Sequence, residues 1–70
     1  MSTVLKVIEV LAESEKSWED AAKNAVKQAG GSLRNIKSIY IENFGASVDG
    51  GKIKNYRVNA KITFVLDKQK

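Results

Sequence analysis

The stretch Ile53–Leu66 reads Ile-Lys-Asn-Tyr-Arg-Val-Asn-Ala-Lys-Ile-Thr-Phe-Val-Leu, and most of it alternates between apolar and polar residues. Successive side chains of a strand point to opposite faces, so this alternation predicts one long β-strand with two different faces. At about 3.3 Å per residue the strand would span roughly 46 Å. One face would carry Tyr56, Val58, Ala60, Ile62, Phe64 and Leu66, and the other Asn55, Arg57, Asn59, Lys61 and Thr63.

A single amphipathic helix is expected upstream of this strand. Ser17 is a favourable N-cap, and Asp20 three residues later gives a pattern similar to a capping box. A helix of about sixteen residues would be only about 24 Å long and could not cover the apolar face of the long strand. The sequence therefore predicts self-association, in which other copies of the chain cover the remainder. The helical stripe consists of Trp18, Ala21, Ala22, Ala25, Val26, Ala29 and Leu33.

Two further strands complete the pattern. Val4–Ala12 is rich in β-branched residues and apolar on both faces, which is typical of a strand buried on two sides. Asn35–Val48 alternates, and Asp49–Gly51 then supplies a tight turn, so the last strand returns antiparallel to it. By parity Ile39 and Ile41 lie on the helix side. The opposite face would combine Ser38, Tyr40, Glu42 and Phe44 with Arg57, Asn59 and Lys61.

Length and composition limit the function. Seventy residues form one domain, 1–70, and a domain this small usually needs disulfides, a metal or oligomerisation. The chain has no Cys and no His, which excludes disulfides and thiolate sites and removes the commonest nucleophile and general base. We therefore expect a protein that is not an enzyme.

The charge pattern does not indicate a nucleic-acid partner. The formal net charge is +4, but the basic residues are scattered and do not interleave with aromatic residues as in a base-stacking platform. The first residues lack the apolar segment of a signal peptide, and no stretch is long and apolar enough to span a membrane. A cytoplasmic protein without a membrane partner is expected.

Five segments in this order resemble the dodecins: Lys6–Val10, Ser14–Ala22, Leu33–Ile36, Tyr56–Val58 and Phe64–Asp67. The resemblance covers nearly the whole chain. It implies an α+β fold of order β-α-β-β, in which a three-stranded antiparallel sheet wraps around one helix. It also implies assembly into a hollow shell of twelve identical subunits.

The resemblance also implies a ligand slot. In flavin-binding dodecins a tryptophan early in the second strand stacks on the isoalloxazine ring, and a glutamine early in the third strand hydrogen-bonds its polar edge. These positions fall on Ser38 and Arg57 here, so both flavin-defining residues are replaced. Tyr40 lies two residues from Ser38 and could form a weaker aromatic wall. Arg57 could instead clamp a phosphate or carboxylate, and twelve copies of Arg57 with Lys61 nearby would make the interior face of the shell electropositive.

We therefore expect a non-enzymatic homo-oligomeric shell that binds or sequesters a small ligand, with flavin (FMN or riboflavin) binding weak or lost. One alternative is a purely structural shell stabilised by a divalent cation such as calcium, as in calcium-type dodecins. Another is a retained flavin storage protein. The residues that would hold a metal stay open. Carboxylates near the helix start either interact favourably with the positive end of the helix dipole or form a cation site together with those of other subunits. They belong to Glu13, Glu15, Glu19 and Asp20.

Overall fold

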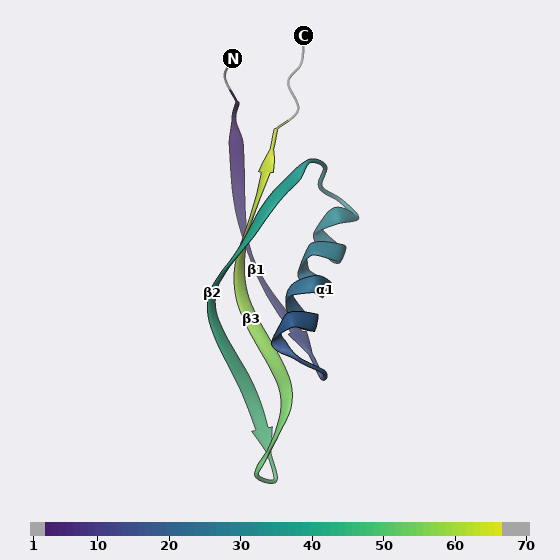
Figure 1. Cartoon of the computed structure of the whole chain (residues 1–70), viewed down its shortest axis with the longest axis vertical. Helices are drawn as coiled ribbons and strands as arrows, with labels where there is room; N and C mark the ends of the chain where they lie inside the picture. Colours follow the sequence, from purple (N-terminus) through teal and green to yellow (C-terminus); the bar gives the residue numbers. More distant parts are fainter. Residues whose placement is uncertain (1–2, 67–70) are drawn as a thin grey trace.

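A computed structural model describes residues 3–66. They form strand β1 (Leu5–Ser14), helix α1 (Trp18–Gly30), strand β2 (Ile36–Asp49) and strand β3 (Lys52–Val65). The strands form one antiparallel sheet of order β1-β3-β2, and α1 covers one of its faces (Figure 1). The predicted β-α-β-β fold is confirmed, with the long strand at the centre of the sheet.

Helix α1 begins as predicted and ends earlier. The Ser17 hydroxyl accepts a hydrogen bond of 2.9 Å from the Asp20 N–H, which satisfies one of the free N–H groups of the first turn. The helix ends at Gly30, three residues before the end of the apolar stripe. Two further backbone hydrogen bonds form a turn after the helix, because the N–H groups of Ser32 and Leu33 both donate to the Ala29 carbonyl. Leu33 thus stays half-buried although it lies outside the helix.

The β2–β3 hairpin turns where the glycines predict it. Gly50 and Gly51 have φ angles of 60° and 79°, in the left-handed region that favours glycine. They lie between the paired residues Asp49 and Lys52. Positive φ at both central residues matches the twist of the flanking strands, so this turn fixes the hairpin register.

A β-bulge in β2 overturns one predicted face assignment. The register shifts first between Ile36 and Ser38, and from Ser38 to Ile41 the strand then keeps the predicted faces. A second shift, between Ile41 and Asn43, makes Glu42 an extra residue. Beyond the bulge, Phe44 lies opposite the buried Val58, on the helix side of the sheet. The prediction that Phe44 lies on the opposite face is wrong, because one extra residue reverses the alternation.

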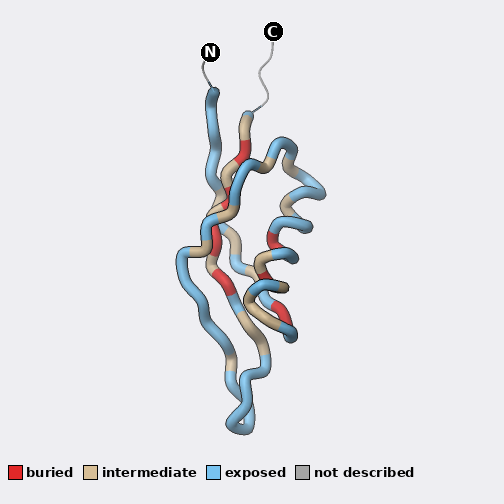
Figure 2. Tube along the Cα trace, viewed as in Figure 1, coloured by how far each residue is buried: buried red, intermediate tan, exposed pale blue. Residues whose placement is uncertain are grey.

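The core is small and lies between α1 and the middle of β3 (Figure 2). Its buried apolar residues are Ala21, Ala25, Val58, Ala60, Ile62 and Phe64, which confirms the predicted apolar face of β3. Leu66 follows the end of β3 and is 38% exposed.

The sheet extends well beyond the helix. The thirteen residues of α1 correspond to roughly 20 Å, whereas the longest dimension of the described chain is 56 Å. Large apolar residues are consequently exposed on every strand. Strand β1 was predicted to be buried on both faces, but within a single chain Leu5, Val7 and Leu11 are more than half exposed. The exposed large apolar residues are Val4, Leu5, Val7, Leu11, Val26, Tyr40, Phe44, Val48, Ile53 and Leu66.

Candidate functional site

The three predicted ligand residues all lie on the sheet face that is turned away from α1, which we call the open face. Ser38 is opposite Thr63 and Tyr40 is opposite Lys61 in the β2–β3 register. Arg57 shares the parity of Lys61 and Thr63 on β3, and all three predicted residues are exposed. All three residues therefore lie on the face predicted from the alternation along each strand.

A single chain nevertheless does not bring Ser38 and Arg57 together. Ser38 pairs with Thr63, six positions along β3 from Arg57. At about 3.3 Å per residue this separation is roughly 20 Å. A ligand slot that uses both side chains must therefore take them from different copies of the chain.

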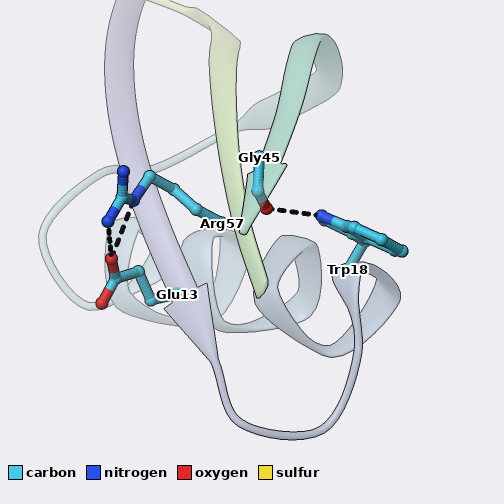
Figure 3. A network of polar contacts seen from close by, with 4 residues as sticks. All are labelled: Glu13, Trp18, Gly45 and Arg57. Carbon is cyan, nitrogen blue, oxygen red and sulfur yellow. Dashed lines mark hydrogen bonds and ion pairs between the residues drawn. The ribbon is translucent and has the colours of Figure 1, made fainter. Parts of the chain in front are cut away.

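Arg57 is held by a carboxylate on the neighbouring strand. Its Nε donates a 2.8 Å hydrogen bond to Glu13 Oε2, and its Nη2 lies 2.7 Å from the same oxygen in an ion pair (Figure 3). Glu13 lies directly opposite Arg57 in the β1–β3 register. Both side chains are about half exposed, at 48% and 46%, so the pair contributes about 0–1 kcal/mol to stability. Arg57 is consequently already engaged in a single chain.

On the opposite flank of Arg57, residues 3–66 leave open space next to Gly45. Gly45 lies across from Arg57 on β2, and a Cβ atom added to Gly45 would meet no atom within 4 Å. The guanidinium side chain therefore has a carboxylate on its β1 side and open space on its β2 side.

The second cation of the open face is also paired with a carboxylate. Lys61 lies 3.6 Å from a Glu42 oxygen, and Glu9 is opposite Lys61 on β1. Around Arg57 and Lys61 the open face thus carries three carboxylates (Glu9, Glu13 and Glu42) against two cations. Within a single chain the neighbouring strands thus supply more negative charge around these two cations than β3 supplies positive charge. The electropositive interior of twelve copies stays a prediction.

Trp18 lies on the helix side and packs against the hairpin. Its indole Nε1 donates a 2.8 Å hydrogen bond to the Gly45 carbonyl (Figure 3). Its ring meets Phe44 and Tyr56 edge-on, at centroid distances of 6.0 and 4.8 Å. These contacts anchor the start of α1 to the β2–β3 hairpin, away from the predicted ligand residues.

The carboxylates at the start of α1 have separate partners. Glu19 lies 3.9 Å from Lys23, and Asp20 accepts a 2.6 Å hydrogen bond from the Ser14 hydroxyl. Within residues 3–66, no three acidic side chains come close enough together to hold a metal ion. A cation site built from these carboxylates would need contributions from more than one copy.

A hollow of about 480 Å³ lies between β1 and α1. None of the predicted ligand residues lines it, and its strand side is an edge of the sheet that no described strand pairs with. Its apolar lining suits the packing of another apolar surface better than polar ligand chemistry. The apolar residues that line it are Ile8, Val10, Leu11, Ala12, Ala25, Ala29 and Leu33.

Sequence reasoning missed the role of Glu13. The sequence showed an acidic residue near the helix start, but not which residue it faces. The signal that would have found it is the β1–β3 register, in which Leu5 pairs with Val65 and Glu13 consequently meets Arg57.

A family model described as Dodecin matches residues 4–67 of the chain. The chain belongs to the dodecin family. It is 32% identical over 62 residues to "Calcium dodecin" of Mycobacterium tuberculosis, and the match covers 89% of this chain and 87% of that protein.

Solved dodecin structures match the fold over nearly the whole chain. The crystal structure of calcium dodecin from M. tuberculosis, described as having a novel calcium-binding site, matches with a TM-score of 0.80 and 34% identity. That match covers 96% of each chain. Dodecin from Streptomyces coelicolor matches with a TM-score of 0.91 and 24% identity, again over 96% of each chain. At 24% identity the second match shows the fold alone.

Within residues 3–66 no helix is long and apolar enough to cross a bilayer.

Proposed function

We propose that the chain forms a non-enzymatic homo-oligomeric shell, of twelve subunits as in the family resemblance, which binds or sequesters a small ligand at its open face. The exposed apolar surface of a single chain supports the proposal that the chain assembles. Among residues 3–66 six apolar residues are buried, three of them alanines, while ten large apolar residues are exposed. So small a core rarely stabilises a chain of this size without other support. Since the chain has no Cys or His, contacts between copies are the support that remains, and homologous dodecins form homo-oligomers.

The ligand residues we propose are Ser38, Tyr40 and Arg57, which lie on one face but far apart in one chain. A slot between copies would combine the Ser38 and Tyr40 end of one open face with the Arg57 end of another. Flavin binding there is expected to be weak. Serine offers no π-surface for stacking, and Arg57 donates hydrogen bonds but cannot accept them as a glutamine can.

A calcium-type shell without an organic ligand is the second candidate. It is supported by the excess of carboxylates around Arg57 and Lys61 and by the 32% identity to a protein named calcium dodecin. Because no single chain gathers three carboxylates within residues 3–66, the cation would be held between copies. A retained flavin storage role is the third candidate. A cytoplasmic location stays a prediction of the sequence.

Native mass spectrometry and a thermal-shift screen together test these candidates. We expect a twelve-subunit mass, and a folded monomer or dimer at micromolar concentration would contradict the assembly. The screen compares riboflavin, FMN, calcium and a chelator on the intact oligomer. Stabilisation by an organic ligand supports a binding shell, and destabilisation by the chelator alone supports the calcium-type shell. A yellow protein that releases flavin on denaturation would instead support flavin storage.

A further inference from the structure

Arg57 has two different surroundings on its two flanks. On the β1 side, Nε and Nη2 converge on one oxygen of Glu13 at 2.8 and 2.7 Å. On the β2 side, Gly45 leaves room next to the arginine. A ligand can therefore reach the guanidinium from the Gly45 side, but only while Glu13 already occupies two of its donor groups.

We propose that Glu13 is a specificity-determining residue of the open face: by engaging Arg57 it makes this site select uncharged ligands over ligands that carry a phosphate or carboxylate. The inference deepens the proposed function and rests on it for the identity of the site. The pairing itself belongs to the single chain and does not depend on assembly.

The charges around Arg57 give the physical reason. An arginine stays protonated at any working pH and would by itself attract a phosphate, to which its planar donor fork is well matched. Here an incoming anion must displace the Glu13 carboxylate or lie beside it, and like charges at close range repel. No spare cation of the same row compensates, because Lys61 is paired with Glu42 and faces Glu9. An uncharged ligand meets neither penalty.

The half-exposed position of the pair makes the selectivity adjustable. Glu13 and Arg57 are 46% and 48% exposed, so removing the carboxylate charge frees the guanidinium without leaving a buried charge. The isosteric change Glu13→Gln should therefore convert Arg57 into an anion-binding group while the fold and the assembly are kept.

The test measures how inorganic phosphate changes the thermal unfolding midpoint of the oligomer, against chloride at equal ionic strength. The unmodified protein should show no phosphate-specific response. Glu13→Gln should bind phosphate up to about fivefold more tightly than the unmodified protein, the largest fold-change that one half-exposed ion pair allows. The matched control is Glu9→Gln, which removes one negative charge from the same face and leaves both the Glu13–Arg57 and the Glu42–Lys61 pairs intact. It should not gain the phosphate response.

The double variant Glu13→Gln with Arg57→Gln should lose the gain again. A gain that persists in the double variant, or that Glu9→Gln reproduces, would overturn the proposal, since general charge would then explain it. Absence of a gain in a correctly assembled Glu13→Gln protein would overturn it as well. If Glu13→Gln fails to assemble, Glu13→Ala is measured in the same way. Failure of both variants to assemble would show that Glu13 is needed for the assembly itself and would refute its role in specificity. An oligomer in which no organic ligand binds, yet Glu13→Gln gains phosphate, would contradict the proposed function alone.

Discussion

Phe44→Ala separates the stability of the chain from the stability of the assembly. Phe44 is 63% exposed in a single chain, although its ring meets Trp18 edge-on. An aromatic side chain presents about 200 Å², so roughly 125 Å² of Phe44 remains for another copy to cover. At about 25 cal/mol per Å², this corresponds to about 3 kcal/mol per subunit if assembly buries the ring. The isolated chain would lose much less.

The assay for Phe44→Ala combines native mass spectrometry over a dilution series with urea unfolding. We expect dissociation at concentrations where the unmodified oligomer is intact, and a lower unfolding midpoint than that of the unmodified protein at the same protein concentration. Lys54→Ala, a change at an exposed polar residue of the same hairpin, is the matched control and should leave both measurements unchanged. If Phe44→Ala assembles normally with an unchanged midpoint, the exposed hairpin surface is not an interface and the reasoning from exposed apolar area fails.

Three further outcomes are expected. Phe64 is 8% exposed in the core, so Phe64→Ala should cost about 3–5 kcal/mol per subunit and prevent assembly, and an unchanged melting temperature would contradict its role. Ser17→Ala removes the N-cap of α1 and should cost about 1 kcal/mol by chemical denaturation, whereas a neutral effect would show that water replaces the cap. The unmodified protein should quench riboflavin fluorescence only weakly. The double variant Ser38→Trp with Arg57→Gln should restore tight riboflavin binding, and only when it is assembled, because the slot forms between copies. Micromolar riboflavin binding by the unmodified protein would contradict the weak-flavin assignment.

The parts of the fold that sequence predicted depend on local patterns. The apolar positions of β3 recur every second residue, and the structure buries Val58, Ala60, Ile62 and Phe64 as that period requires. The helix start follows from Ser17 and Asp20, and the hairpin turn from Gly50 and Gly51. In each case residues that are neighbours in the chain determine the outcome.

The parts that sequence missed depend on residues far apart in the chain. Glu13 meets Arg57 only because β1 pairs with β3 in one particular register, across more than forty positions. Each residue alone reads as an exposed charge. The pairing changed the interpretation of the candidate site, since an arginine that was expected to attract anions is neutralised by a neighbour that the pattern could not locate.

The bulge at Glu42 links the two surfaces on which the proposed function depends. With strict alternation from Ile41, Phe44 would lie on the open face and Gly45 on the helix side. The extra residue exchanges them, so that Phe44 lies on the face where Trp18 packs and Gly45 lies across from Arg57. The Phe44 ring thereby joins the apolar surface that another copy can cover. The open space at Gly45 lies next to Arg57, where a ligand can bind. The bulge residue itself also pairs with Lys61, which engages the second cation of the open face. One inserted residue thus determines both the apolar character of the helix side and the charge and space around Arg57, which is why such bulges are better understood as functional features than as irregularities of a strand.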